Sequence, residues 1–182
     1  MFFVASGSVR VMIQSAGREV LLRQINAGEL FGELAAIDGQ PRSSGIVATT
    51  DVTIARMPAS VFRATIQAHS EVCDKLLGIL AGQIRTLANR VNEFSTLDVR
   101  YRIYAELLRL SRTDGANTGR GIISPPPVHA EIAARVSTRR ETVAREFKAL
   151  ERAGLIERRR GAIALSDVHH LGRLIEEAIN NS

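Results

Sequence analysis

Six apolar residues in the middle of the chain recur at intervals that alternate between three and four positions. They are Leu77, Leu80, Ile84, Leu87, Val91 and Phe94. This is the spacing of the a and d positions of a coiled coil, so the pattern predicts one long helix. The residues beside the stripe are mostly polar, which favours a narrow seam buried against a second helix over a helix packed on its own domain. We therefore expect residues 71–97 to form a dimerisation helix.

The segment before this helix has the pattern of β-strands. Val9, Val11 and Ile13 alternate with other residues at a period of two, and further apolar clusters follow before Pro58. This alternation is typical of strands that bury one face. We expect a small antiparallel roll over residues 1–70, ending in a short helix.

Basic residues are concentrated in the last part of the chain. Residues 1–97 carry nine Lys and Arg against eight Asp and Glu, whereas residues 98–182 carry fifteen against eleven. Within residues 135–160 the counts are nine and four. A local excess of this kind predicts a surface that faces a phosphate backbone.

A new helix is expected to begin after the seam. Asp98 suits its N-cap, and the helix should run to about Arg112. The change from a heptad helix to a capped helix indicates a hinge at residues 96–98 and a third domain over residues 98–182. The polar, glycine-rich residues 113–121 are expected to form a flexible loop.

Residues 128–165 have the order of elements of a winged helix-turn-helix. We expect a short helix over His129–Arg135, a tight turn, a second helix from about Arg139 to Ala153, and a basic hairpin. Three apolar residues at helical spacing should hold the second helix on the domain, namely Val143, Phe147 and Leu150.

The outward residues of the second helix and the hairpin are the predicted DNA contacts. They are Thr138, Arg139, Arg140, Glu141, Arg145, Arg158, Arg159 and Arg160. Arginine can bond guanine with two hydrogen bonds, glutamate can accept from the cytosine amino group, and hairpin arginines can contact phosphates. Thr138 and Glu141 also fit a capping box, which is an alternative or additional role for Glu141. A solvated turn is the alternative for the hairpin arginines, and the order of the elements favours DNA.

At this point the chain resembles a known family. Residues 140–145, Arg-Glu-Thr-Val-Ala-Arg, are similar to the recognition helix of the CRP/FNR family of bacterial transcription regulators, and Leu97-Asp98-Val99 resembles its hinge. The resemblance implies an α+β chain with an N-terminal antiparallel β-roll, a long dimerisation helix and a C-terminal winged helix-turn-helix. It also implies a homodimer on double-stranded DNA, an inverted repeat with GTGA-like half-sites, and RNA polymerase as a further partner.

The resemblance extends upstream to an effector site. Residues 31–37, Phe-Gly-Glu-Leu-Ala-Ala-Ile, and 41–44, Pro-Arg-Ser-Ser, are similar to the phosphate-binding cassette of cyclic-nucleotide domains. Arg42 can meet the charge of a cyclic phosphate, and Glu33 can accept a hydrogen bond from a ribose hydroxyl. A surface ion pair is the alternative, and the ordered surroundings favour the cassette. The resemblance implies effector contacts from Gly32, Glu33, Leu34, Arg42, Ser43, Ser44, Thr86 and Leu87.

Two features depart from the family pattern. Cyclic-AMP-binding relatives contact the base with a Thr-Ser pair on the dimer helix, where this chain has Leu87-Ala88, with Thr86 beside them. We therefore expect base recognition to differ, with cyclic AMP the first expectation and cyclic GMP the second. The chain also begins inside the family's roll, so the roll is expected to be incomplete. A ligand-independent dimerisation scaffold is the alternative role of the sensor domain.

Several classes of protein are disfavoured. The one cysteine, Cys73, excludes an internal disulfide and an iron–sulfur cluster held by several thiolates of one chain. No signal peptide and no run of roughly 20 apolar residues is present, so we expect a cytoplasmic protein without a membrane partner. No catalytic triad, metal-spaced His/Cys group or Walker-type loop appears, and His69 alone does not support haem. We expect no enzyme, no metal site and no required cofactor.

Overall fold

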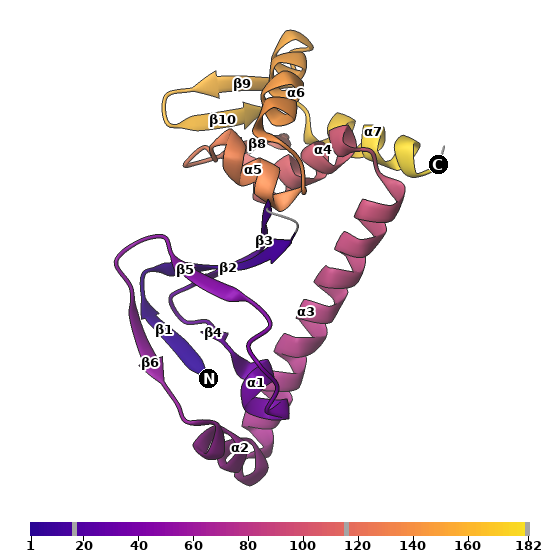
Figure 1. Ribbon diagram of the computed structural model, residues 1–182. Helices are drawn as coiled ribbons and strands as arrows, with labels where there is room; N and C mark the ends of the chain where they lie inside the picture. The colour runs from indigo at the N-terminus through magenta and orange to yellow at the C-terminus, as the bar shows by residue number, and fades with distance from the viewer. Residues whose placement is uncertain (16–17, 115–116, 181–182) are drawn as a thin grey trace. The chain divides into compact units, whose positions relative to one another are not determined.

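The computed structural model describes residues 1–15, 18–114 and 117–180 of the chain (Figure 1). The chain divides into two compact units, residues 1–87 and 88–182. The division lies within the longest helix, α3 (Ser70–Thr96). The predicted three-part division at residues 70 and 97 stays a prediction.

The first unit consists mainly of antiparallel strands, as predicted. In chain order its elements before α3 are β1 (Phe2–Ser6), β2 (Ser8–Ser15), β3 (Arg18–Asn26), β4 (Leu30–Phe31), α1 (Glu33–Asp38), β5 (Gly45–Ala48), β6 (Thr53–Arg56) and α2 (Ala59–Ala68). They form two three-stranded sheets, with strand orders β4-β1-β6 and β3-β2-β5. Val9 and Val11 of β2 are buried while Arg10 is half-buried, so the predicted period-two alternation is confirmed as far as Val11. It does not extend to Ile13, which is half-buried like Met12, because the pairing of β2 with β3 shifts register between Val11 and Met12.

The apolar interior of the first unit is split into two small clusters. One joins the strands through Val4, Val9, Val11, Ile25 and Phe31. The other joins α1, α2 and α3 through Ala36, Phe62 and Leu76. All residues of β5 and β6 are exposed.

The second unit packs four helices and the end of α3 with a four-stranded sheet. Its further elements are α4 (Val99–Leu110), β7 (Arg112–Asp114), β8 (Asn117–Ile123), α5 (His129–Arg135), α6 (Arg140–Arg152), β9 (Ile156–Arg159), β10 (Ala162–Leu165) and α7 (Val168–Asn180). The sheet is antiparallel, with strand order β7-β8-β10-β9. One continuous core runs through this unit, and Val143, Phe147 and Leu150 lie in it as predicted. The predicted α+β fold with a winged helix-turn-helix is confirmed.

The flexible loop predicted over residues 113–121 is wrong. β7 and β8 pair across this segment, with Thr113 opposite Gly121. Gly121 is closely packed there, because a Cβ atom would lie 3.0 Å from side-chain atoms of Ser111 and Val168 and these would have to shift by a few tenths of an ångström. β8 pairs with β7 along this segment and with β10 from Gly121 to Ile123, and these pairings supply backbone hydrogen bonds, so the polar composition did not prevent a strand. Gly115 and Ala116 lie outside the described residues.

The predicted capping box of α6 is also wrong. The N-cap of α6 is Arg139 rather than Thr138, and its side chain makes no capping hydrogen bond. The amide of Thr138 instead donates to the carbonyl of Ala133 at 2.9 Å, which completes the turn after α5 and shifts the helix start by one residue. Asp98 does occupy the N-cap position of α4, although its side chain makes no capping hydrogen bond.

A buried ionic network joins three helices of the second unit. Glu106 of α4 is only 1% exposed, and its carboxylate accepts hydrogen bonds from Arg109 and, at 3.2 Å, from Arg135 of α5. Arg109 also bonds Glu93 of α3 at 2.6 Å, and Arg90 of α3 donates to the carbonyl of Arg135. Burial opposes the charge of Arg109, but Glu106 and Glu93 hold its pKa above the ordinary value. The network fixes the last turns of α3 to the first helix of the helix-turn-helix.

Candidate functional site

Apolar residues anchor the two helices of the helix-turn-helix in the core of the second unit, and the first turn of α6 remains exposed. Ile132 of α5 and Val143 of α6 are fully buried. Ser137 turns the chain between the helices with φ of 52°, a left-handed conformation that shortens the connection. The side chains of Arg140 and Glu141 are 76% and 68% exposed. The first turn of α6 is therefore presented to solvent, where a major groove could receive it.

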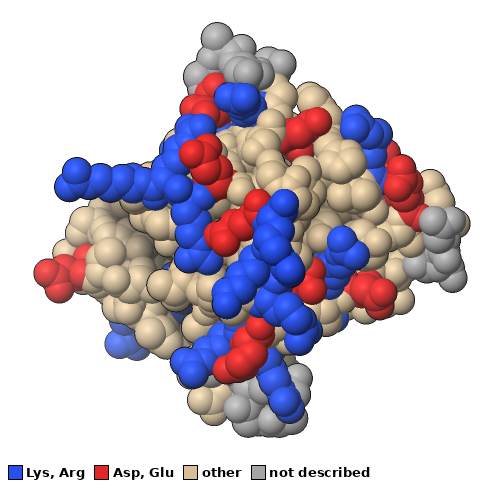
Figure 2. All heavy atoms as spheres, turned by 90° about the horizontal axis from the view of Figure 1, so that it is seen from above, with Lys and Arg blue, Asp and Glu red and all other residues tan. Residues whose placement is uncertain are grey.

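The predicted DNA contacts lie on α6, the residues before it, and the β9–β10 hairpin. Arg139, Arg140, Glu141 and Arg145 are exposed on or beside α6, and Thr138 is half-buried. Arg158 and Arg159 lie on β9, and Arg160 lies in the turn that follows. Seen from the side of α6 and the hairpin in Figure 1, the surface carries many Lys and Arg side chains with acidic side chains among them (Figure 2). We call this surface the basic face.

Several arginines of the basic face are bonded to neighbouring carboxylates. Arg140 donates to Glu141 at 2.9 Å, and this bond holds the pKa of Glu141 below its ordinary value. Arg159 contacts Glu157 at 3.1 Å and Asp114 at 3.5 Å. Because all these pairs are partly exposed, each contributes little to stability and can be exchanged for a phosphate at small cost.

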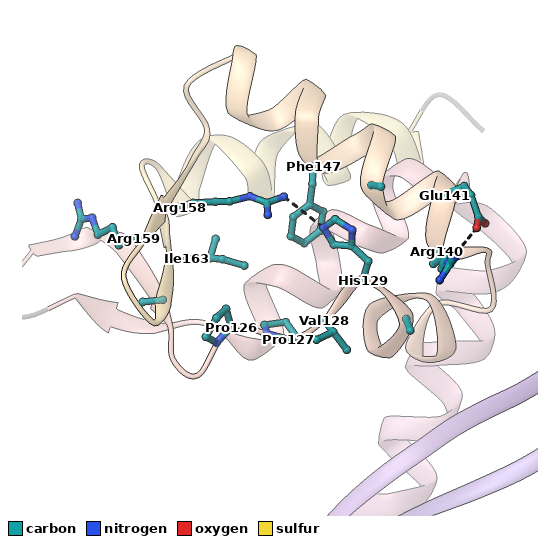
Figure 3. A pocket seen from close by; sticks show the side chains of 13 residues that line it. Pro126, Pro127, Val128, His129, Arg140, Glu141, Phe147, Arg158, Arg159 and Ile163 are labelled. Atoms are coloured by element: carbon teal, nitrogen blue, oxygen red, sulfur yellow. Dashed lines mark hydrogen bonds and ion pairs between the residues drawn. The ribbon is translucent and has the colours of Figure 1, made fainter.

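A cleft of about 710 Å³ lies between α5, α6 and the hairpin (Figure 3). Its walls are the prolines before α5, the first residues of α6, and β9 with β10. His129 and Arg158 point toward each other across it, and the guanidinium Nη2 lies 3.4 Å from the imidazole Nε2. The ring of Phe147 lies edge-on to His129, with centroids 5.0 Å apart.

A second cavity, of about 790 Å³, lies in the first unit between the strands, α1 and α3. All eight residues predicted to contact an effector line it: Gly32, Glu33, Leu34, Arg42, Ser43, Ser44, Thr86 and Leu87. Its volume is in the range of cavities that hold small organic ligands. We call it the effector cavity.

Arg42 and Gly32 are fitted to each other at this cavity. The guanidinium Nη1 of Arg42 donates to the carbonyl of Gly32 at 2.9 Å, and the group lies 5.3 Å from the ring centre of Phe2. Gly32 has φ of 71°, and a Cβ atom there would lie 2.5 Å from that nitrogen. Only glycine therefore allows both the left-handed turn into α1 and the position of Arg42.

Glu33 connects the cassette to α3. It is 6% exposed, and its carboxylate accepts a hydrogen bond of 3.4 Å from the amide of Gln83. Gln83 and Thr86 lie on the face of α3 that lines the cavity. A ligand that forms a hydrogen bond with Glu33 would therefore contact a carboxylate that is already bonded to Gln83 of α3.

The predicted seam on α3 is largely solvent-exposed in the single chain. Leu77, Ile84, Leu87 and Val91 are between 49% and 66% exposed, Phe94 is 38% exposed, and Leu80 is half-buried. Apolar side chains in one row at this exposure are typical of a surface that meets a partner. Leu87 belongs to both the seam and the lining of the effector cavity.

Comparison with known families assigns one family to the first part of the chain and another to the last part. The family described as cyclic nucleotide-binding domain matches residues 1–69, and the family described as Crp-like helix-turn-helix domain matches residues 101–174. The chain is 32% identical over 158 residues to the cAMP-activated global transcriptional regulator CRP of Salmonella typhimurium, which covers 86% of this chain and 75% of that protein. The chain belongs to the CRP/FNR family. It is a DNA-binding transcription regulator, as its relatives are, rather than an enzyme.

Other family members give the same result. The CRP-like cAMP-activated global transcriptional regulator of Mycobacterium tuberculosis is 29% identical over 175 residues, or 95% of this chain and 78% of that protein. The solved structure of a CRP/FNR-family transcriptional regulator from Thermus thermophilus superimposes with a TM-score of 0.72 at 28% identity, covering 96% of this chain and 87% of that one. The family and the fold are therefore shown by two independent kinds of comparison.

Two other results concern what the described part of the chain contains. Among residues 1–15, 18–114 and 117–180, no three His, Cys, Asp or Glu side chains gather as a metal site would require. Within the same residues no helix combines the length and the apolar character needed to cross a lipid bilayer.

Three residues that contact the predicted site residues or line the two cavities were not predicted from the sequence. Gln83 stands one helical turn before Leu87, so helical spacing could have found it. Phe2 and His129 carried no local signal, because each reaches its site through contacts with distant residues, Arg42 and Arg158 respectively.

Proposed function

We propose that this regulator binds DNA as a homodimer under the control of a cyclic nucleotide, cyclic AMP in preference to cyclic GMP. The observation that carries the proposal is the shared position of Leu87, which lines the effector cavity and also belongs to the exposed seam of α3. A ligand held beside Leu87 alters the surface on which a second copy packs. It thereby favours one arrangement of the two DNA-binding units over another.

The chemistry of the effector cavity suits a cyclic nucleotide. The Arg42 guanidinium has five N–H donors, and it can give a cyclic phosphate charge-assisted hydrogen bonds in addition to the bond with Gly32. Glu33 is an acceptor for a ribose hydroxyl. The Thr86 hydroxyl donates to the carbonyl of Gly82 at 2.9 Å, so its oxygen can still accept a hydrogen bond from the base, which Leu87 and Ala88 cannot do. Either purine has N–H groups that can donate to it, so we keep cyclic GMP as the second candidate.

The effector proposal is tested by calorimetric titration of the protein with each nucleotide, with and without operator DNA. Coupling between effector and DNA is reciprocal, so DNA should tighten nucleotide binding, by roughly 5- to 150-fold. Arg42→Ala should abolish nucleotide binding. Arg63→Ala is the matched control, because Arg63 also donates to a carbonyl of α1, that of Ala36 at 3.2 Å, yet does not line the cavity. Absence of binding by both nucleotides would favour a ligand-independent scaffold.

The dimer proposal is tested by the molar mass in solution. Ile84→Asp and Val91→Asp place a charge on exposed seam positions and should convert the protein to a monomer. Val61→Asp is the control, since Val61 is 49% exposed on α2, away from the seam. A dimer that survives both seam variants would disprove this interface.

For DNA, we propose an inverted-repeat operator with GTGA-like half-sites read by Arg140, Glu141 and Arg145. Arg145→Ala should cost about 1–3 kcal/mol and relax one base position, whereas Arg159→Ala should weaken all sequences alike. Selection from a randomised duplex library measures both effects. Identical behaviour of the two variants would remove the base-reading assignment. RNA polymerase is the further partner that membership of this family suggests.

A further inference from the structure

The cleft between α5, α6 and the β9–β10 hairpin contains a polar pair, His129 and Arg158, that is separate from the proposed base-reading residues. His129 is half-buried at the start of α5, and Arg158 reaches it from β9 (Figure 3). The lining is otherwise mainly apolar on this side, with Pro126, Pro127 and Ile163. A polar pair set in apolar walls gives a ligand both direction and partial exclusion of water.

The charge state of His129 follows from this contact. Arg158 can only donate, so a hydrogen bond at 3.4 Å requires that Nε2 of His129 carries no proton. A protonated ring would instead turn an N–H donor toward the guanidinium. Two donors at that distance repel each other unless a shared acceptor lies between them.

The other charged groups around the ring act in the same direction or are already bonded. Desolvation by the surrounding residues and the neighbouring Arg158 hold the pKa of His129 below its ordinary value, and Glu151 of α6 opposes them. Glu151 is itself bonded to Arg158, and Arg140 is bonded to Glu141. On α5, Glu131 is bonded to Arg135 at 3.1 Å. His129 is therefore mainly neutral near pH 7 in the protein without DNA.

We propose that the cleft receives one phosphodiester of the DNA backbone between Arg158 and a protonated His129, so that binding of DNA takes up a proton. A phosphate oxygen supplies the acceptor that both nitrogens need, and its negative charge favours the imidazolium form. The proposal rests on the proposed DNA-binding function and adds its regulation by pH. Affinity for any DNA sequence rises as the pH falls, because the contact is to the backbone and not to a base.

The experiment measures the dissociation constant of the full chain for one operator duplex from about pH 5.5 to 7.5 at constant ionic strength. With one proton taken up, wild-type affinity should fall by roughly three- to tenfold across this range. His129→Gln should lose this pH dependence and bind at low pH as weakly as the wild type does at high pH. His129→Arg carries a permanent charge, so it should bind at about pH 7.5 more tightly than the wild type and with little pH dependence.

His169→Gln is the matched control, since His169 is an exposed histidine on α7 outside the cleft lining; it should keep the wild-type pH profile. The salt dependence gives a second readout. At about pH 5.5 the slope of the logarithm of the binding constant against the logarithm of salt concentration should be smaller in magnitude for His129→Gln, by about one.

If the His129 variants fold poorly, the ring resonances of wild-type His129 still decide the matter. Their NMR titration should give a higher pKa in the complex than in the protein alone. An unchanged or lower pKa in the complex, or equal pH profiles for wild type and His129→Gln, would overturn the proposal. Failure of the wild type to bind DNA at any pH would instead remove the proposed function itself, so the two failures are distinguishable.

Discussion

The two units of this regulator bury their apolar residues in different ways. In the second unit one continuous core of fourteen buried residues connects helices and sheet, and all four residues of β10 are buried. In the first unit the interior is split into clusters of five and three buried residues, and β5 and β6 are exposed throughout. A single large core resists local opening, whereas small separate clusters leave more of the structure dependent on ligands and partners.

The difference matches the work of each unit. A DNA reader must present α6 in one geometry, and the continuous core with the Glu106 network holds it there. In the proposed function the first unit is the sensor. It has a cavity of about 790 Å³ and an exposed apolar row on α3, so we expect a bound ligand or a second copy to add to its stability.

The largest effect is expected from truncation of the second core. Phe147→Ala should lower the free energy of unfolding of this unit by about 3–5 kcal/mol, because Phe147 is 1% exposed in the continuous core. Tyrosine fluorescence reports on the second unit alone, since the two tyrosines are Tyr101 and Tyr104 and there is no tryptophan. Its denaturant midpoint should fall.

Phe62→Ala is the companion change in the first unit, where Phe62 is 4% exposed in the smaller cluster. It should lower the circular-dichroism midpoint of the first unit and leave the tyrosine transition in place. If both variants moved the tyrosine transition equally, the two units would unfold as one and the comparison would be lost.

The next effect concerns the ionic network. Glu106→Gln removes the charge that Arg109 and Arg135 share, and it should destabilise the second unit by about 1–3 kcal/mol. Each of these two cations then loses one of its two carboxylate partners, while Arg109 keeps Glu93 and Arg135 keeps Glu131. Glu157→Gln is the control, as Glu157 pairs with Arg159 at 63% exposure and should change stability by less than about 1 kcal/mol. Equal effects in urea titrations would show that the network is no more important than a surface pair.

A smaller effect is expected at the cassette. Gly32→Ala forces a left-handed backbone on alanine, at about 1–2 kcal/mol, and places a methyl group against Arg42. Nucleotide binding should fall by more than stability alone explains. Gly39→Ala has the same backbone strain, with φ of 73°, but no atom within 4 Å of the added carbon. If calorimetry finds an equal loss of nucleotide binding in both variants, the contact between Gly32 and Arg42 has no specific role in effector binding.

The smallest effect is pH-dependent. The backbone amide of His170 donates to Asp167 at 2.9 Å at the start of α7, and this bond holds the pKa of Asp167 below its ordinary value. A depressed carboxyl pKa stabilises the fold above the unfolded pKa and ceases to do so as the pH falls through the folded value. Asp167→Ala should therefore lower the Tm at pH 7.

The difference from wild type should disappear between about pH 5 and pH 2. Asp98→Ala is the control, because Asp98 makes no capping bond at α4 and its removal should leave the Tm nearly unchanged at both pH values. A Tm difference for Asp167→Ala that persists at low pH would point to a cause other than the carboxylate.

Local patterns accounted for most elements of this chain. The extent of α5 and the buried face of α6 followed from helical spacing, because the hydrogen bonds and side-chain faces of a helix repeat within four residues. The β2 alternation was readable for the same reason at a period of two. The DNA-contact residues were predicted from their helical positions and charge and then supported by the family resemblance, whereas the effector contacts were implied by the resemblance. The roles of both sets stay predictions.

The sequence by itself predicted five of the helices, α2 to α6, together with the strand character of the first unit and the heptad stripe of α3, because these patterns repeat within a few residues. It gave no prediction of α1 or α7. Tertiary structure alone decided that residues 112–114 and 117–123 form strands, that Glu106 lies in a buried network, that Gln83 bonds Glu33, and that His129 faces Arg158. Each of these depends on residues that lie apart in the chain. Such contacts are set by the packing of whole elements and leave no periodic signal in the sequence.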